Sequence, residues 1–427
     1  MLKLRNNIRF LLFLIGSQCY HLAYAQQDPL LKLVDVKPVK IVRQISIKDS
    51  VGVKIQEITF QFNDTAEVYA VITSPIAKGN YPGMLVLHGG GGSAEKDKAI
   101  SWAQRGYVAV APDLPGIAEP KKLTNTKGRW NTLTYGAERY IANPDVTTSI
   151  IFDAVQSAMQ ALHLLQAQTN VDKKHIGVVG ISWGGYMTTM VCALAGQQVK
   201  AGFSVFGCGF YEYTSQVSTL DKMALKEKQD WLQYLDAGRR VNNMKASFFI
   251  AGATNDFFFY PKAVQRTLDA IQAEKNQVYA PNVSHKIPLP GGSFEDSVNA
   301  EPFTPTAFQP YPTPKGNKAN WLSMEVPYME YYLKQKGTPF PVVNALMRKE
   351  SNLVDIQIKS ALSLTNVVVY WSDACADVKK CVWTSLQPKM IDQLKYQFEL
   401  PSQAKQWFVV ASDERPVSVS SRLFIEE

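Results

Sequence analysis

From Lys54 onward, short apolar runs alternate with longer segments in which apolar residues recur at about every third or fourth position. The short runs predict β-strands, and the longer segments predict helices with one apolar face. The predicted strands are 54–62, 68–74, 83–87, 108–112, 176–180, 202–206, 246–252 and 277–280. The predicted helices between them are 96–104, 146–168, 184–195 and 261–273.

The central strands are apolar throughout, whereas a strand with one face in water alternates apolar and polar residues. A continuous apolar run is what a strand covered on both faces requires. The regular succession of strands and helices therefore predicts an α/β fold, with a mostly parallel sheet flanked by helices on both sides.

Two polar and aromatic segments, 114–144 and 210–243, interrupt this succession. Both follow strand ends at the same edge of the predicted sheet, where α/β proteins place their sites. We interpret them as candidate walls or lids over a pocket. Loops that only cover the sheet are the alternative.

The pattern changes towards the C-terminus. Residues 281–316 are rich in Pro, Gly and Ser and predict an extended connection, and 320–336 predicts one more helix. Beyond Pro339, short β-branched runs are separated by polar turns. The sequence therefore predicts an α/β domain over 26–338 and a small β-rich, sandwich-like module over 339–427.

The first residues have the features of an export signal. A basic start is followed by the apolar run 10–16 and by small residues at Ala23 and Ala25. This pattern predicts a signal peptide over 1–25, so we expect the mature protein to be exported, either to the periplasm or out of the cell.

Net charge narrows the range of partners. The full chain has a formal charge of +8, and removal of Lys3, Arg5 and Arg9 with the predicted signal leaves +5. Because no dense basic run is interleaved with aromatics, we do not expect nucleic-acid binding.

No later stretch approaches the ~20 apolar residues that span a bilayer, so no transmembrane segment is expected. The oligomeric state stays open.

Cysteine spacing predicts one disulfide. Export permits disulfides, and Cys375 and Cys381 would close a short loop in the β-rich region, although both as free thiols is an equal alternative. Cys192 and Cys208 are expected to be small buried residues. Because no CxxC or HExxH motif occurs, we expect neither a metal nor another cofactor.

The strongest motif is Gly180-Ile-Ser182-Trp-Gly184, a GxSxG box between an apolar strand and a helical segment. Small residues on either side of the serine allow a sharp turn that exposes its hydroxyl above the sheet edge. The motif therefore predicts Ser182 as a nucleophile.

A serine hydroxyl needs a base beside it. Among five histidines, His285 follows a late strand in a loop, and the order nucleophile, acid, base favours it. Asp256 ends an apolar strand just before the helix opened by Pro261, which is the position expected for the acid. Asp221, Asp236 and Asp296 lie in polar loops and are weaker candidates.

Acyl transfer also needs donors aimed at the developing oxyanion. The run His88-Gly-Gly-Gly-Gly92 follows a predicted strand, and glycines allow backbone N–H groups to approach a substrate closely. We therefore expect the N–H groups of Trp183 and a residue near Gly90 to form the oxyanion hole. A phosphate-binding loop is the weaker alternative, because no GK[ST] follows.

Several runs resemble a known family. LVLHGGGG, RGYVAVAPDLPG, GISWGGYM, VFGCGF and GATNDFFFYP, with the late Ser-His at 284–285, are similar to the dienelactone-hydrolase and acetyl-xylan-esterase-like branch of the α/β-hydrolases. The resemblance covers roughly 55–335 and extends to the prolyl-oligopeptidase catalytic domain. It implies an α/β-hydrolase fold and the roles given above to Ser182, Asp256 and His285. Dienelactone hydrolases themselves use cysteine where this chain has serine, which disfavours lactone hydrolysis.

The resemblance implies an esterase that removes acetyl or other short acyl groups from carbohydrates. A prolyl-oligopeptidase-type serine peptidase is the alternative, and a binding protein on an inactive scaffold is disfavoured because all three triad positions are filled. Trp183 and the run Phe257 to Tyr260 could form the floor of a sugar or acyl pocket. We expect at least two of the three phenylalanines to belong to the core, because alternate residues of an extended run face opposite ways.

Overall fold

The computed structural model describes residues 28–50, 52–133, 136–285, 288–289, 292–293, 321–415 and 417–426. The predicted signal peptide lies outside these residues, as does most of the predicted connection at 281–316. Within the described part of the chain, no helix is both long and apolar enough to cross a membrane.

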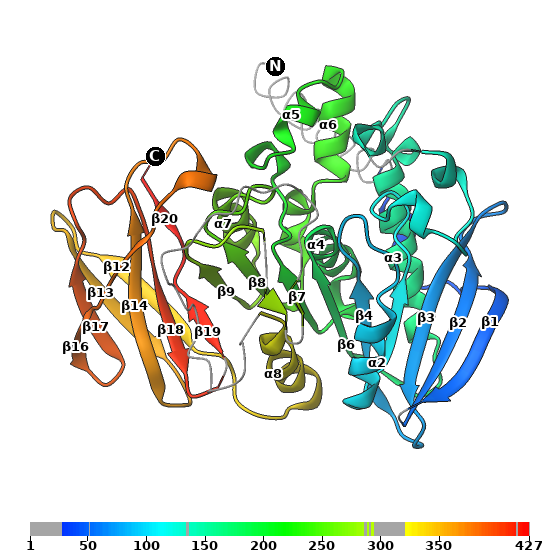
Figure 1. Cartoon of the computed structure of the whole chain (residues 1–427), viewed down its shortest axis with the longest axis horizontal. Helices are drawn as coiled ribbons and strands as arrows, with labels where there is room; N and C mark the ends of the chain where they lie inside the picture. The colour runs from blue at the N-terminus through cyan, green and yellow to red at the C-terminus, as the bar shows by residue number, and fades with distance from the viewer. Residues whose placement is uncertain are drawn as a thin grey trace, which may run out of the picture.

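Within the described residues, the centre of the molecule is a nine-stranded sheet (Figure 1). From β5 to β9 neighbouring strands are parallel, whereas β1, β2 and β3 form an antiparallel extension that joins β5. In spatial order the strands are β1 (Ile41–Ser50), β2 (Val53–Gln61), β3 (Glu67–Pro75), β5 (Val108–Pro112), β4 (Tyr81–Leu87), β6 (Val171–Ile181), β7 (Ala201–Val205), β8 (Ser247–Ala253) and β9 (Lys275–Ala280).

Helices cover both faces of this sheet (Figure 1). One face carries α2 and α8, which are joined by an ion pair between Lys98 and Glu325. The other face carries α3 and α4, as the packing of Gly83 on β4 against Leu165 of α3 shows. The α-helices are α2 (Lys96–Gln104), α3 (Ile150–Gln166), α4 (Trp183–Ala195), α5 (Val217–Leu220), α6 (Leu225–Tyr234), α7 (Pro261–Ala270) and α8 (Trp321–Lys334).

Short 3-10 helices fill the connections. They are η1 (Leu31–Leu33), η2 (Pro120–Lys122), η3 (Arg129–Thr132), η4 (Ala137–Tyr140), η5 (Val146–Thr148), η6 (Gly196–Gln198), η7 (Tyr211–Tyr213), η8 (Ala237–Arg239), η9 (Val241–Asn243) and η10 (Val378–Lys380). The α/β class and the flanking helices predicted from the hydrophobic pattern are thus confirmed.

The C-terminal region is β-rich, as predicted. Its described strands form two sheets, linked by ring contact between Phe398 of one sheet and Trp407 of the other at 5.6 Å. The first sheet, in spatial order, is β12 (Val342–Met347), β13 (Leu353–Lys359), β17 (Lys395–Glu399) and β16 (Lys389–Asp392). The second is β15 (Thr384–Leu386), β14 (Leu364–Ser372), β18 (Gln406–Asp413) and β19 (Ser418–Ser420), with β20 (Phe424–Ile425) paired to β18. A two-stranded hairpin, β10 (Pro288–Leu289) and β11 (Gly292–Ser293), lies between α7 and α8 in sequence.

This C-terminal module lies beside β9 and α7 (Figure 1). The Tyr279 ring of β9 lies 5.7 Å from that of Phe408 in β18, and the Gln277 side chain donates to the Ser421 carbonyl at 2.7 Å. The module is therefore packed directly against the last strand of the central sheet. The domain boundary at 338 stays a prediction.

The predicted cysteine chemistry is confirmed within the described residues. Cys375 and Cys381 form a disulfide, while Cys192 and Cys208 are buried free thiols. Burial raises the pKa of both free thiols, which keeps them protonated and unreactive.

Candidate active site

Ser182 occupies a sharp turn between β6 and α4. Its backbone has φ 57° and ψ −120°, a conformation that non-glycine residues adopt only where the surrounding structure enforces it. The enforcing contacts come from the flanking glycines. A Cβ on Gly180 would lie 2.3 Å from the Gly184 carbonyl oxygen, and one on Gly184 would lie 2.1 Å from that of Leu87. Only glycine fits at both positions.

The three residues predicted as a triad come together in the structure. The Ser182 Oγ and the His285 Nε2 are 2.8 Å apart, and the His285 Nδ1 and the Asp256 Oδ2 are 2.9 Å apart. Ser182 comes from the turn after β6, Asp256 from the loop after β8 and His285 from the loop after β9. The carboxyl ends of three parallel strands therefore supply the set.

Asp256 is fully buried and uses both carboxylate oxygens. While Oδ2 faces the imidazole, Oδ1 accepts hydrogen bonds from the backbone N–H groups of Phe258 and Phe259, at 2.7 and 3.0 Å. These two donors fix the carboxylate plane. With Nδ1–H donating to Asp256, the Nε2 of His285 is free to accept the serine proton.

Aromatic rings enclose His285. The centroid of its ring lies 4.5 Å from that of Phe206 and 5.0 Å from that of Phe258, with Phe257 and Phe259 each at 6.0 Å. The expectation that two of the three consecutive phenylalanines belong to the core is wrong, because only Phe259 is buried. The segment folds into a turn around Asp256 instead of running as an extended strand, so the alternation argument does not apply.

The glycine loop after β4 lies against the Ser182 turn. A Cβ on Gly89 would lie 3.1 Å from the Ile181 carbonyl oxygen and 3.6 Å from the Ser182 Cβ. Further along, the N–H groups of Gly91 and Gly92 donate to Ile117 and Gly89. No partner for the Gly90 N–H is found among the described residues.

The predicted oxyanion donors can be placed in the same way. Trp183 is the first residue of α4, so its N–H has no acceptor within the helix. Trp183 and Gly90 thus lie on the two backbone segments that meet at Ser182, and their role as oxyanion donors stays a prediction.

His88 has a role that the sequence did not reveal. Its buried ring accepts the Leu114 N–H at Nε2, 2.9 Å away, so the ring proton resides on Nδ1 and is donated to the Gly89 carbonyl at 2.8 Å. Burial lowers the pKa of His88 to about 4, which keeps the ring neutral. Since the Gly89 carbonyl and the Gly90 N–H belong to one rigid peptide, His88 sets the direction of that N–H. Its position directly before the glycines was the only signal available.

The two interrupting segments pack together next to Ser182. The Tyr140 ring from the first lies 5.9 Å from that of Trp183 and 5.5 Å from that of Trp231 in the second. The Ala142 N–H also donates to the Glu227 carboxylate at 2.7 Å. Within the described residues, both segments therefore form a wall over the N-terminus of α4.

The two weaker acid candidates that the structure describes, Asp221 and Asp236, have partners outside the triad. Asp236 is buried, contrary to its expected place in a polar loop, and accepts the backbone N–H groups of Phe210, Tyr211 and Gly238 at 2.7 Å each. Burial raises the pKa of Asp236 to about 6. Asp221 pairs with Lys228, and Asp296 lies outside the described residues.

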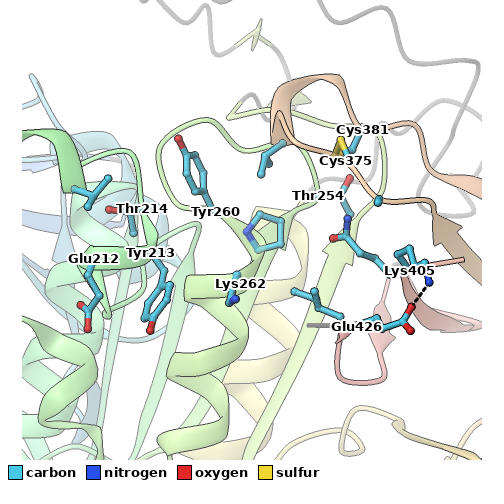
Figure 2. Close-up of a pocket in the computed structure, with 16 residues that line it drawn as sticks. Glu212, Tyr213, Thr214, Thr254, Tyr260, Lys262, Cys375, Cys381, Lys405 and Glu426 are labelled. Atoms are coloured by element: carbon cyan, nitrogen blue, oxygen red, sulfur yellow. Dashed lines mark ion pairs between the residues drawn. A yellow bond between two sulfur atoms is a disulfide. The ribbon is translucent and has the colours of Figure 1, made fainter.

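A cleft of about 610 Å³ lies at the boundary with the C-terminal module. Figure 2 shows Tyr213 and Tyr260 on the α/β-domain side, with the Cys375–Cys381 disulfide and the Lys405–Glu426 ion pair on the other. The cleft is beside the triad and not over it, since neither Ser182 nor His285 is among its lining residues.

Two known proteins are similar to parts of this chain. A chain from Felis catus, dipeptidyl peptidase 4, is 25% identical over 212 residues, which is 48% of this chain but only 26% of the cat protein. A Synechocystis sp. protein provisionally named a carboxymethylenebutenolidase is 25% identical over 154 residues, 34% of this chain and 56% of that protein. This chain therefore spans less than two thirds of either relative.

Among solved structures, acetyl xylan esterase 1 from Thermoanaerobacterium sp. JW/SL YS485 shares the fold. It superposes with a TM-score of 0.50 at 18% identity, covering 60% of this chain and 86% of the esterase. The sequence profile of the dienelactone hydrolase family matches residues 68–285, just over half of the 427 residues and a range that contains Ser182, Asp256 and His285. This chain therefore belongs to the dienelactone hydrolase family of α/β-hydrolases.

Proposed function

We propose that the protein is an exported serine carboxylesterase that removes acetyl or other short acyl groups from carbohydrates. The observation that carries this proposal is the continuous chain of hydrogen bonds from Ser182 through His285 to Asp256. Membership of a hydrolase family supports the reaction class. The carbohydrate substrate rests on the resemblance of the motifs, and export rests on the pattern of residues 1–25.

The reaction proceeds in two halves. Ser182 Oγ attacks the ester carbonyl while His285 Nε2 takes the hydroxyl proton, and the oxyanion is bound by the N–H groups of Trp183 and Gly90. Collapse breaks the bond to the alcohol, which leaves with the proton from His285. Water then gives a proton to His285 and attacks the acyl-serine. Collapse of this second intermediate breaks the bond from the acyl carbon to Ser182 Oγ, and His285 returns the proton to Oγ as the carboxylic acid is released. Throughout, Asp256 stabilises the imidazolium.

The aromatic rings around His285 support a small acyl group. Phe257 and Phe258 are half-buried and flank the imidazole, so they offer an apolar surface close to the reacting carbonyl. Such a surface excludes water from the acyl-serine and favours a methyl or short alkyl group over a charged one.

A serine peptidase is the second candidate. The similarity to dipeptidyl peptidase 4 supports it, because the same triad chemistry cleaves amides. The match covers only the part of that protein that corresponds to this chain, so the substrate selection of the whole relative does not transfer.

The test is hydrolysis by the mature protein of p-nitrophenyl acetate, longer p-nitrophenyl esters, acetylated xylan and a proline-containing peptide anilide. Ser182→Ala is measured in parallel, with Ser402→Ala, an exposed serine of the C-terminal module, as the matched control. We expect fast acetate release that is lost in Ser182→Ala and kept in Ser402→Ala. Cleavage of the anilide in preference to every ester would establish the peptidase instead. Absence of turnover that depends on Ser182 would refute both.

A further inference from the structure

The loop that joins β14 to β15 in the C-terminal module reaches the catalytic residues. It contains η10 and is closed by the Cys375–Cys381 disulfide. Figure 2 shows this disulfide next to Thr254, two residues before Asp256. The module therefore contacts the loop that supplies the acid.

Asn255, directly before Asp256, is the first link. It is buried, and its Nδ2 donates to the carbonyls of Cys381 and Val378 at 2.7 and 3.0 Å. Its Oδ1 accepts the Thr254 hydroxyl at 2.7 Å. One side chain thus attaches the acid loop to the disulfide-closed loop of the module.

Asn282, three residues before His285, is the second link. It is also buried and forms a reciprocal pair with Trp383: its Nδ2 donates to the Trp383 carbonyl, and the Trp383 N–H donates to its Oδ1, both at 2.8 Å. Its φ of 57° lies in the left-handed region, where asparagine is among the few tolerated residues. The base loop is thereby attached to the same segment of the module.

Thr254 joins the two links. Its hydroxyl donates to Asn255 and accepts the Asn282 N–H at 2.8 Å, so the acid loop, the base loop and the module form one buried network. The Asn255 N–H adds a bond to the Val283 carbonyl at 3.1 Å. Because the network is buried, each link has one geometry, and the separation of Asp256 and His285 depends on it.

From these contacts we propose that the C-terminal module is part of the catalytic machinery, with Asn255 and Asn282 as positioning residues that hold Asp256 and His285 in register with Ser182. This proposal rests on the serine-hydrolase function proposed above. Small misplacement of a base relative to its nucleophile lowers the rate of the chemical step much more than it changes substrate binding. The module therefore acts on kcat through the loops that carry the acid and the base.

The experiment uses the full-length protein and three variants. Asn255→Ala removes the first link. Asn282→Gly removes the second without adding strain, because glycine accepts a positive φ. Asn276→Ala is the matched control, because Asn276 Nδ2 donates to the Pro341 carbonyl at 2.7 Å across the same boundary, but at the amino end of β9, away from the triad.

Asn255→Ala and Asn282→Gly should each lower kcat for p-nitrophenyl acetate by roughly 10- to 100-fold, with KM changed by less than about twofold. The rate at which a fluorophosphonate labels Ser182 should fall in parallel. Asn276→Ala should keep both rates. Asn282→Asp, which keeps the acceptor for the Trp383 N–H and tolerates the positive φ, should recover part of the loss seen in Asn282→Gly.

The kcat values of the variants and of the wild type separate failure of the positioning role from failure of the proposed function. Unchanged kcat in folded Asn255→Ala and Asn282→Gly, with wild-type turnover that depends on Ser182, would overturn the positioning role and leave the proposed function intact. An equal loss in Asn276→Ala would also overturn it, since the effect would then be general to the domain boundary. If wild-type Ser182 neither turns over esters nor reacts with the fluorophosphonate, the proposed function fails, and the positioning role fails with it.

Discussion

The nucleophile and its two partners are held in different ways. Ser182 is fixed from within the α/β domain, by glycines packed against backbone and by its own N–H donating to the Val205 carbonyl at 2.8 Å. The loops of Asp256 and His285 are fixed in addition from outside, through Asn255 and Asn282 and the C-terminal module. The strained turn is thus built locally, whereas the two loops that carry the acid and the base have an additional support from a separate part of the chain.

The largest expected effect tests the acid. In Asp256→Asn, the amide oxygen can still accept the two backbone N–H groups, but the amide N–H then faces His285 Nδ1. The imidazole must carry its proton on Nε2, where it cannot accept the serine proton. We expect kcat to fall by roughly 10⁴-fold with the fold retained. Ester hydrolysis assays measure kcat, and circular dichroism checks the fold. A loss of under tenfold would contradict the assignment of the acid.

Next is the local support of the nucleophile. Gly184→Ala places a Cβ 2.1 Å from a backbone carbonyl oxygen that cannot move aside, so we expect the free energy of unfolding to fall by about 3 kcal/mol or more. Gly196→Ala, at the other end of α4, has a positive φ but no atom within 4 Å, so it meets only the backbone cost and should lose about 1–2 kcal/mol. Urea denaturation measures both. A loss at Gly184 no larger than that at Gly196 would contradict the tight packing of Gly184 against the Leu87 carbonyl.

His88 gives a pH-dependent prediction for the glycine loop. Its folded pKa of about 4 lies below the ordinary value near 6.5, so the unfolded chain binds more protons between these limits. The His88 contribution to stability is present above pH 6.5 and lost as the pH falls to 4, a change of about 3 kcal/mol.

The measurement is the difference in unfolding free energy between wild type and His88→Asn, which should shrink as the pH falls from 7 to 4. Buried Asp113 and Asp236, whose raised pKa values are about 6, act in the opposite sense but are common to both proteins. A difference that is constant with pH would contradict a neutral His88 in the folded state.

The smallest expected effect concerns the external support. Replacing Cys375 and Cys381 with serine opens the loop whose carbonyls accept Asn255, and a loop this short loses about 2 kcal/mol of local stability. We expect kcat to fall by about fivefold, less than in Asn255→Ala, because the acceptors remain in the chain. Reduction of the wild type with dithiothreitol should reproduce the fall, and the double serine variant should not respond to the reductant.

Local patterns predicted much of this architecture. The bounds of α2 and β5 agree with the prediction, since a helix period and a fully apolar run carry their own limits. β1 was missed because it is an edge strand exposed along its length, which mixes isoleucine with charged residues and shows no buried face. β6 begins five residues earlier than predicted, at Val171. The prediction missed this part of the strand because residues 172–175 are polar.

The residues of the candidate site also fall into those that the sequence predicted and those that it did not. Ser182 was predictable because the GxSxG box is a local motif, and Asp256 and His285 because each follows a predicted strand in the chain order nucleophile, acid, base. Asn255 and Asn282 were not, because their partners lie more than 100 residues away in a loop of unrelated composition. His88 stands out in the sequence only by its place before the glycine run, and its bond to the Gly89 carbonyl depends on a tautomer that only the Leu114 N–H defines.

The support from the C-terminal module also orders events during synthesis. A ribosome completes Ser182, Asp256 and His285 before it reaches the loop from Cys375 to Trp383. A nascent chain, or one cut after the α/β domain, would carry the nucleophile without a base and an acid held in place. On the positioning role proposed above, full hydrolytic activity would be acquired only when the late-synthesised module has docked, and partially made chains would hydrolyse substrate more slowly than the complete protein.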